Sequence, residues 1–584
     1  MSLSKIQEAR DKGVILLVGA PGAGKSTFCH NTVLRNMAID RPVIIVTTEQ
    51  GPQEVVELLT NGGLVEKKKL NIVDAFTQTV GLKCNPGESI ICANCSDLNS
   101  MSIAITKLRE RTGKKDTLLV FDSLTSPYLF NGMEVVKFMR LFLSKFVSEG
   151  NSVIATVDEG CGREEDIGAM MSVSDGVVKI EMREDRQLFN VVKHPGLKPE
   201  RIEAPIEKDL IGLGPSWSFD PDMMRYFFQS YMKGKGLRNE VGDYVNLFWP
   251  NLAHWSCMMW DPKKFSTMIY KLNKEETSMV DNIRYFPWKL RLMMKSFTML
   301  RLFPRNFSRV KDMSKLHYWP APKTEQIGIL EYSKDKSKTD EHYIRIYESS
   351  DCWGLDNIGT TVASHIPPYF AGMLMFWEKN KRDWNAIETK CIGLGDPYCE
   401  WKVVPGEISE LKNFLEKDID IVEKIYKRLI QHITGFILDS KPLKERPRLG
   451  NEIHVHSVMH LMGFPHVAGE RYRMAQRMGG AKAGKEIGEQ LMARGLSGDE
   501  ALKRVFDFMN YCKVGKVIAE DGSIKIKENC ESLRTLIVAT RIKEPCCYFT
   551  TGFLNGLFLS VKGKRVIEKK CIVADDPYCE WEIV

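Results

Sequence analysis

Apolar runs alternate with amphipathic segments along the first 215 residues. A helical pattern over 133–147 stands between the last two of four apolar runs, each of which is short enough to be a buried strand. Such an alternation is typical of a parallel sheet with helices on its faces. We therefore predict an α/β domain over residues 1–215, with buried strands near residues 14–18, 43–47, 117–121 and 153–157.

The rest of the chain contains an internal repeat. The segment Cys391–Val404 recurs as Cys571–Val584, with nine of fourteen residues identical and an offset of 180. The repeat predicts two further α+β domains, at residues 216–404 and 405–584. Apolar positions at helical spacing from Glu407 to Ile437 predict an amphipathic helix that joins the two copies.

Length and composition agree with a multidomain globular protein. The chain has 584 residues, of which 43% are hydrophobic and 27% charged. Residues 216–584 carry 56 basic against 47 acidic residues, whereas residues 1–215 are slightly acidic. The N-terminus lacks an apolar signal segment and no run reaches the length of a membrane span, so we expect a cytoplasmic location and reduced cysteines.

The first predicted strand leads directly into a glycine-rich loop. The segment Gly19–Thr27 reads GAPGAGKST and is a full match to the phosphate-binding P-loop. Glycines let backbone N–H groups point at a phosphate, and the following helix adds its positive N-terminus. Lys25 would neutralise phosphate charge and Ser26 would bind magnesium. The predicted ATP-binding residues of the loop are Gly22, Ala23, Gly24, Lys25, Ser26 and Thr27.

Two acidic residues follow other predicted strands. Asp122 ends the strand at 117–121, where P-loop ATPases place the carboxylate that holds magnesium. Glu49 follows the strand at 43–47, at the sheet edge where a general base could polarise the attacking water. A solvated loop acid is the alternative interpretation of Glu49.

Five ordered motifs of residues 1–210, from GAPGAGKST to RQLFNVVKHPG, resemble the KaiC branch of the RecA-like ATPases. The resemblance implies that Glu49 activates water and that subunits assemble into homo-oligomers, as a dimer or a hexamer-like ring. It also implies that Lys193 reaches the nucleotide of a neighbouring subunit. The arginine expected two residues after that lysine is Pro195 here, which removes a stabilising transition-state charge. We therefore expect slow hydrolysis.

The repeated segment carries a metal-ligand pattern. Each copy reads Glu-x2-Cys-x7-Cys, as Glu388, Cys391 and Cys399 and as Glu568, Cys571 and Cys579. Zinc takes a fourth ligand, for which Cys547, or its neighbour Cys546, is available in the second copy and His365 in the first. Buried structural cysteines are the alternative. A separate group, Cys84, Cys92 and Cys95, is expected to consist of unligated thiols.

The two copies resemble the 4-vinyl-reductase domain family, most closely over 445–584 and less closely over 216–404. That family includes the sensor domains of phenol-responsive transcription activators, in which a zinc site lies beside a pocket for small hydrophobic or aromatic ligands. The resemblance implies the same roles for Cys547, Glu568, Cys571 and Cys579, and for Glu388, Cys391 and Cys399.

These observations predict an ATP-binding, slowly hydrolysing signal-transduction or transcription-regulatory protein, with ATP, magnesium and zinc as cofactors. Two alternatives stay open, an adaptor with a vestigial ATPase and an enzyme acting on a tetrapyrrole-like substrate. Residues 284–311 contain eight basic residues and no acid among aromatic ones, which predicts either contact with DNA or an anionic membrane, or an ordinary core helix.

Overall fold

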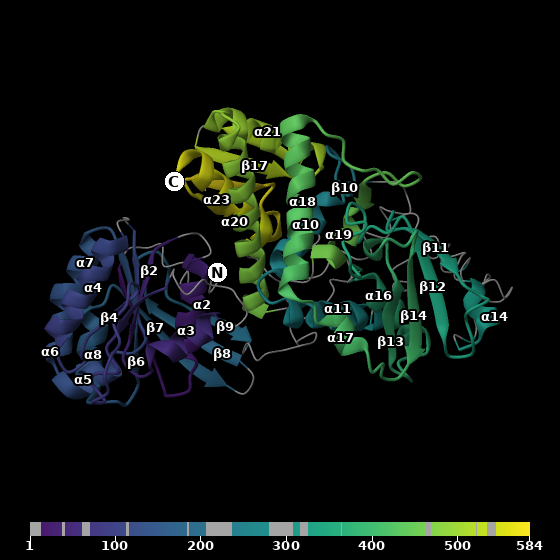
Figure 1. Cartoon of the computed structure of the whole chain (residues 1–584). Coiled ribbons are helices and arrows are strands. Elements are labelled where there is room, and N and C mark those ends of the chain that lie inside the picture. The colour runs from purple at the N-terminus through teal and green to yellow at the C-terminus, as the bar shows by residue number, and fades with distance from the viewer. Residues whose placement is uncertain are drawn as a thin grey trace. The chain divides into compact units, whose positions relative to one another are not determined.

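The computed structural model describes residues 13–37, 41–60, 70–112, 116–183, 186–205, 236–279, 292, 306, 308–315, 325–363, 365–462, 469–520, 522–533 and 545–584. The chain divides into two compact units, Met1–Lys208 and Asp209–Val584 (Figure 1). Most of the basic segment 284–311 lies outside the described residues, so its predicted surface contact stays a prediction.

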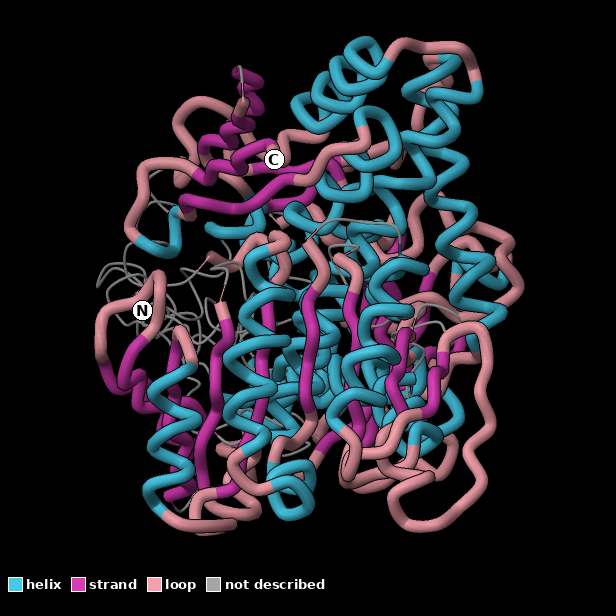
Figure 2. Tube along the Cα trace, turned by 90° about the vertical axis from the view of Figure 1, so that its left-hand side faces the viewer, coloured by secondary structure: helices cyan, strands magenta, loops and turns pink. Residues whose placement is uncertain are grey.

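The first unit is built on one large sheet with the order β4-β3-β2-β5-β6-β1-β7-β8-β9. The pairs from β4 to β7 are parallel, and β8 and β9 continue the sheet in antiparallel fashion. In Figure 2 these strands run side by side with helices in front of them. The strands are β1 (Val14–Gly19), β2 (Val43–Thr47), β3 (Asn71–Asp74), β4 (Ile90–Cys92), β5 (Leu118–Phe121), β6 (Ser152–Asp158), β7 (Gly176–Arg183), β8 (Arg186–Lys193) and β9 (Glu200–Pro205).

This sheet confirms the mostly parallel α/β fold, because all four predicted strands are present as β1, β2, β5 and β6. The helix predicted over 133–147 is also present, although its middle turn is a π-helix. The helices of the unit are α2 (Lys25–Met37), α3 (Pro52–Thr60), α4 (Leu98–Thr112), α5 (Thr125–Asn131), α6 (Glu134–Phe138), the π-turn η2 (Met139–Leu143), α7 (Ser144–Ser148) and α8 (Glu164–Val173).

The second unit holds the two sequence copies, each with a four-stranded antiparallel sheet. The orders are β11-β12-β14-β13 and β16-β17-β19-β18. Ile346 pairs with Cys399 in the first sheet and Ile526 with Cys579 in the second, so the offset of 180 holds across the ladders. The strands are β11 (Ile329–Tyr332), β12 (His342–Tyr347), β13 (Trp384–Lys390), β14 (Cys399–Pro405), β16 (Lys516–Glu520), β17 (Ser523–Lys527), β18 (Val566–Lys570) and β19 (Cys579–Ile583).

Helices cover these sheets, and the joining helix predicted over 407–437 is split in two, α17 (Leu411–Leu415) and α18 (Ile419–Asp439). No helix of the described residues is long and apolar enough to cross a membrane. The remaining helices are α10 (Phe248–Met258), α11 (Pro262–Met279), α14 (Val310–Met313), α16 (Ile366–Trp377), η4 (Ile392–Leu394), α19 (Val455–Met462), α20 (Gly469–Ala493), α21 (Gly498–Tyr511), α23 (Tyr548–Lys562) and η5 (Ile572–Ala574).

Helices α20 and α23 pack at backbone contact. A Cβ placed on Gly484 would overlap the carbonyl oxygen of Phe553, and one on Gly556 would overlap that of Ala481. Gly484 and Gly556 therefore have a packing role, which explains why a glycine is kept inside each helix despite its cost of about 1 kcal/mol relative to alanine.

The two copies interlock through their first strands. Strand β10 (Tyr244–Asn246) of the first copy pairs antiparallel with β15 (Glu452–His454) of the second. Arg238, just before β10, donates to the carbonyl oxygen of Lys513 in the second copy at 2.7 Å, and Arg446, just before β15, donates to that of Gln326 in the first. Because each copy completes the other, both belong to one compact unit, and residue 404 marks the end of a repeat within it.

Candidate nucleotide site and metal centres

The P-loop joins β1 to α2 at the carboxyl edge of the large sheet. Gly22 and Gly24 adopt φ angles of 80° and 83°, which side chains disfavour, so glycine is needed at both positions. Lys25 begins α2 and is buried. Its Nζ donates to the carbonyl oxygens of Gly19 and Ala20, both at 2.8 Å, and lies 2.7 Å from Oδ1 of Asp158. The backbone of the loop therefore surrounds the Lys25 ammonium group and holds its positive charge inside the loop.

The two residues predicted to bind magnesium lie together. Asp122 follows β5, and its buried carboxylate accepts a hydrogen bond from Ser26. Burial and the nearby charge of Glu49 raise the pKa of Asp122 to about 6. Glu49 is exposed after β2, close enough to act on that carboxylate electrostatically. Ser26, Asp122 and Glu49 thus occupy one end of the sheet, as hydroxyl, carboxylate and base would in a P-loop ATPase.

Lys193 lies elsewhere in its own unit. It pairs with Val177 at one end of β7, whereas Gly19 pairs with Ile180 nearer the other end. Its Nζ donates to the carbonyl oxygens of Ser174 at 2.6 Å and Ser172 at 3.2 Å. Val177 and Ile180 are three residues apart along β7, a separation of about 10 Å, so Lys193 is at about this distance along the strand direction from the start of the P-loop. Lys193 therefore does not lie beside the P-loop of its own chain.

Two further residues contact the P-loop and were not predicted from the sequence. Asp158 ends β6, the strand beside β1, and its position after a predicted strand was the available signal. Gln187 of β8 donates from Nε2 to the carbonyl oxygen of Ala23 at 2.8 Å. No sequence motif marks Gln187, because it arrives through the antiparallel extension of the sheet.

The raised pKa of Asp122 predicts a pH dependence. A carboxyl group with a raised folded-state pKa stabilises the fold most below its ordinary pKa and loses that contribution as pH rises through about 6. Magnesium needs the ionised form, so nucleotide binding should change in the opposite direction. We expect magnesium-dependent ATP affinity to fall about tenfold between pH 7 and pH 5.

Titration calorimetry of ATP with the Asp122→Asn variant beside the wild type separates this effect from the titration of ATP itself. Equal pH profiles for the two proteins would show that Asp122 does not hold the metal.

Each copy of the second unit gathers three sulfurs and one carboxylate. The ligand atoms within each group lie within 4.8 Å of one another, and every residue is buried. The sulfur–sulfur distances run from 3.4 to 3.9 Å in the two groups. Zinc–sulfur bonds of about 2.3 Å in a tetrahedron place sulfurs about 3.8 Å apart. The first cluster is Cys352, Glu388, Cys391 and Cys399, and the second is Cys547, Glu568, Cys571 and Cys579.

The carboxylates support a metal ion independently of the sulfurs. One oxygen of Glu388 accepts from the N–H of Ala363 at 3.3 Å, and one of Glu568 from the hydroxyl of Thr551 at 2.9 Å. The other oxygen of each is buried and has no hydrogen-bond partner among the described residues. A buried oxygen without a partner is costly, and coordination to zinc would satisfy it.

The structure corrects the fourth ligand of the first copy. His365 stands directly before α16, as Cys547 stands before α23, so the two positions correspond. However, Nδ1 of His365 lies 2.7 Å from Asp351, and Cys352 supplies the fourth atom instead. With the offset of 180, Cys352 corresponds to Ser532, whose hydroxyl lies 3.3 Å from the sulfur of Cys579. The two copies therefore draw their fourth ligand from different segments: Cys352 from the loop after β12, and Cys547 from the residue directly before α23.

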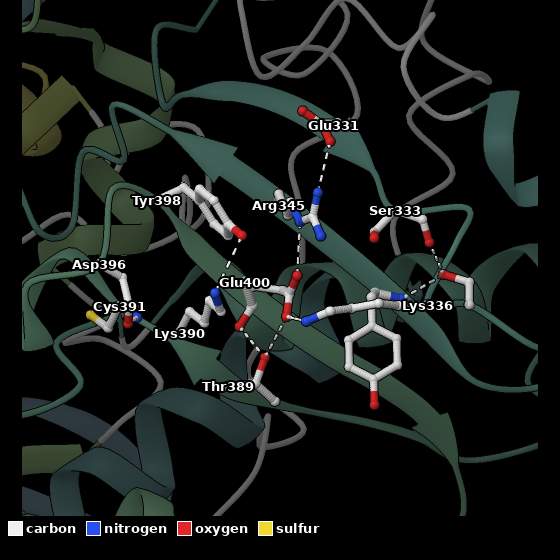
Figure 3. A network of polar contacts seen from close by, with 12 residues as sticks. Glu331, Ser333, Lys336, Arg345, Thr389, Lys390, Cys391, Asp396, Tyr398 and Glu400 are labelled. Atoms are coloured by element: carbon white, nitrogen blue, oxygen red, sulfur yellow. Dashed lines mark hydrogen bonds and ion pairs between the residues drawn. The ribbon is translucent and has the colours of Figure 1, made fainter.

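The Asp-Pro-Tyr-Cys-Glu motif orients these ligands. Asp396 accepts from the N–H of Cys391 at 3.0 Å, and the N–H groups of Val362 and Gly393 donate to its sulfur. Burial alone would raise the pKa of Cys391, yet the donors around its sulfur lower it, which favours the thiolate that a metal needs. On the other face of the sheet Glu400 bridges Arg345 and Lys336, at 2.8 and 2.7 Å (Figure 3).

Ligand assignment in the first copy gives a direct prediction. Cys352→Ser should remove one of two zinc ions per chain, because a tetrahedral site loses a thiolate. His365→Ala should leave both ions in place. Zinc content of the purified variants, measured by inductively coupled plasma mass spectrometry, decides between the two residues. Loss of zinc from the histidine variant alone would restore His365 as the ligand.

The cysteines of the first unit differ from expectation. Cys84 and Cys92 form a disulfide, with Cα atoms 6.2 Å apart, whereas Cys95 is a buried free thiol. The loop after β3 folds back and places Cys84 beside the end of β4, which the residue spacing does not show.

The fold and the site define a P-loop ATPase domain built on a RecA-like sheet. The family described as "ATPase: KaiC" matches residues 7–202, so this part of the chain is similar to the KaiC-type ATPases. UPF0273 protein MJ1359 of Methanocaldococcus jannaschii is 26% identical over 187 residues, which are 30% of this chain and 74% of that protein. Uncharacterized protein MJ0150 of the same organism is 38% identical over 81 residues, 14% of this chain and 44% of that protein.

Among solved structures, the KaiC-like protein PH0186 from Pyrococcus horikoshii OT3 is similar, with a TM-score of 0.26 and 16% identity. The match covers 36% of this chain and 88% of that chain.

Proposed function

We propose that the protein is an ATP-dependent signalling protein in which two zinc-containing copies sense a small hydrophobic ligand and alter the nucleotide state of the ATPase domain. The observation that carries the proposal is the buried cluster of three sulfurs and a carboxylate, present twice in a chain that also holds a P-loop. Regulation of transcription is the output that the 4-vinyl-reductase resemblance implies.

Helix α18 offers a route for a signal between the two copies. Lys417, just before it, donates to the hydroxyl of Thr361 at 2.8 Å, and His432 lies 3.0 Å from the carbonyl oxygen of Gly354. These contacts hold the loop that provides Cys352 and the N–H groups of Val362 and Ala363 to the first cluster. On its other side, Tyr426 of α18 donates to Glu486 of α20 at 3.0 Å. A change at the first cluster would therefore move a helix that also packs on the second copy.

Slow hydrolysis fits the nucleotide site. Pro195 cannot supply the positive charge that an arginine would offer to the transition state, while Lys193 keeps the position from which it could reach a neighbouring subunit. Homo-oligomeric assembly is therefore part of the proposal. A chain that binds ATP without any turnover would act as an adaptor instead.

Coupling between the units can be measured as a change in ATP affinity. The double variant Cys391→Ser/Cys571→Ser disrupts both clusters, and Cys257→Ser/Cys512→Ser replaces two buried cysteines outside them. If the metal-containing copies bias the ATPase domain, the first variant should shift the ATP dissociation constant by about fivefold or more and the second should not. Equal affinities in all three proteins would rule out the coupling.

A further inference from the structure

An open groove of about 540 Å³ lies in the second copy, between α21, the β16–β17 hairpin and the end of α23. The rings of Phe506 and Phe558 face it from two helices, with centroids 6.4 Å apart. Its volume is within the range of about 300–1,000 Å³ that small-molecule sites have. The larger apolar residues of the lining are Leu502, Phe506, Val517, Ile524, Phe558 and Ile583.

The first copy shows what occupies the corresponding place there. With the offset of 180, His342 corresponds to Gly522. His342 pairs with Val403 across the sheet, and Gly522 likewise accepts a hydrogen bond from the N–H of Ile583, the residue that corresponds to Val403. Trp384 corresponds to Lys564. The partner of Val403 is Ala386 and that of Ile583 is Val566, and Trp384 and Lys564 each stand two residues before that partner. The rings of His342 and Trp384 are fully buried and stacked, with centroids 5.6 Å apart.

Two aromatic rings of the first copy are thus replaced by a glycine and an exposed lysine in the second. Neither Gly522 nor Lys564 can fill the space of an indole stacked on an imidazole, so the groove remains open to solvent. The groove is therefore a consequence of the two replacements, glycine for His342 and lysine for Trp384. The first copy therefore indicates the shape of what fits, a flat aromatic ring system.

The charges at the rim indicate the rest of the ligand. In the first copy the guanidinium of Arg382 lies 4.8 Å from the centroid of the Trp384 ring, a cation–π contact. In the second, Lys562 lines the groove but pairs with Asp499 at 2.7 Å. Lys503 and Lys564 also line the groove and make no ion pair with the described residues. Of the acidic residues in the lining, Asp499 and Glu520 are paired with lysines, and among the described residues only Asp507 has no such pair. The unpaired charge is positive.

We propose that this groove binds a small planar aromatic molecule that carries a negative group. The aromatic part lies against Phe506 and Phe558, in the place that corresponds to that of Trp384 in the first copy, and the anionic group faces Lys503 and Lys564. The proposal rests on the proposed sensing function and gives it a ligand class. The groove is separate from the metal cluster, because Ile583 and Cys579 stand at opposite ends of β19, about 13 Å apart.

Calorimetric titration of the full-length protein with indole-3-acetate, and with the neutral indole-3-ethanol, tests the proposal. Lys564→Trp places an indole where the first copy has one and should weaken indole-3-acetate binding at least about tenfold. Lys569→Trp, at an exposed position of β18 outside the groove lining, is the matched control and should bind as the wild type does. Lys503→Glu should weaken binding of the acid without affecting the neutral compound.

The outcomes separate this proposal from the proposed function. Unchanged indole-3-acetate affinity in Lys564→Trp, or equal affinity of the acid and the neutral compound, would overturn the groove assignment. Failure of the wild type to bind either compound at millimolar concentration would also overturn it. The effect of the cluster variants on ATP affinity would be untouched by these results, since that measurement uses no aromatic ligand.

Discussion

Replacing Lys25 with alanine should abolish ATP turnover. The Nζ of Lys25 is the cation held inside the P-loop, within 2.8 Å of two backbone carbonyl oxygens and paired with Asp158. In a P-loop ATPase such a lysine binds the β- and γ-phosphates and stabilises charge that develops during transfer. Loss of one preorganised electrostatic contact of this kind costs about two to three orders of magnitude in rate. We expect phosphate release to fall at least about a hundredfold.

Lys179→Ala is the matched control for this variant. Lys179 belongs to β7, the strand beside β1, and its amine pairs with Glu159 at 3.6 Å. Phosphate release by the control should stay within about twofold of the wild type, because an exposed ion pair contributes little. Turnover by Lys25→Ala at the level of the control would mean that the P-loop does not catalyse the hydrolysis.

Replacing Cys571 with serine should empty the second metal centre and destabilise the second unit. The variant removes a central thiolate and leaves the buried groups of Cys547, Cys579 and Glu568 without a shared cation. An uncompensated buried charge costs about 3–5 kcal/mol, and metal binding is itself folding free energy. We expect a loss of one zinc ion per chain and a decrease of about 3–5 kcal/mol in the free energy of unfolding.

Zinc analysis and urea unfolding of the same preparations measure both effects. Cys512→Ser is the control, since Cys512 is also buried in the second unit but lies outside the clusters. It should keep both zinc ions. A Cys571→Ser protein with two zinc ions and wild-type stability would show that the cluster is an ordinary packing of thiols.

Local motifs predicted the nucleotide site because its parts follow one another along the chain. The P-loop is a strand, a turn and a helix in sequence, and Asp122 and Glu49 each follow a predicted strand whose end reaches the same sheet edge. Parallel sheets bring such ends together whatever lies between them. The remote position of Lys193, by contrast, follows from the antiparallel direction of β8, which apolar patterning does not reveal.

The sequence predicted those metal ligands that belong to the repeated motif. Glu388, Cys391 and Cys399 lie within twelve residues, and a tight Asp-Pro turn brings them together. Cys352 comes from the loop that follows β12, and only the ladder between β12 and β14 brings this loop beside Cys399. Likewise, the contacts of Arg238 and Arg446 that join the copies are long-range contacts with backbone carbonyl groups, which have no sequence signature.

Native mass spectrometry of the full-length protein, purified without added metal and exposed to ATP, tests the central claim most directly. The claim is that one chain combines a P-loop nucleotide site with two metal centres. It predicts one nucleotide and two zinc ions per chain in the wild type, one zinc ion in Cys352→Ser, and no nucleotide in Lys25→Ala. A folded wild-type chain that carries ATP but no metal would contradict it.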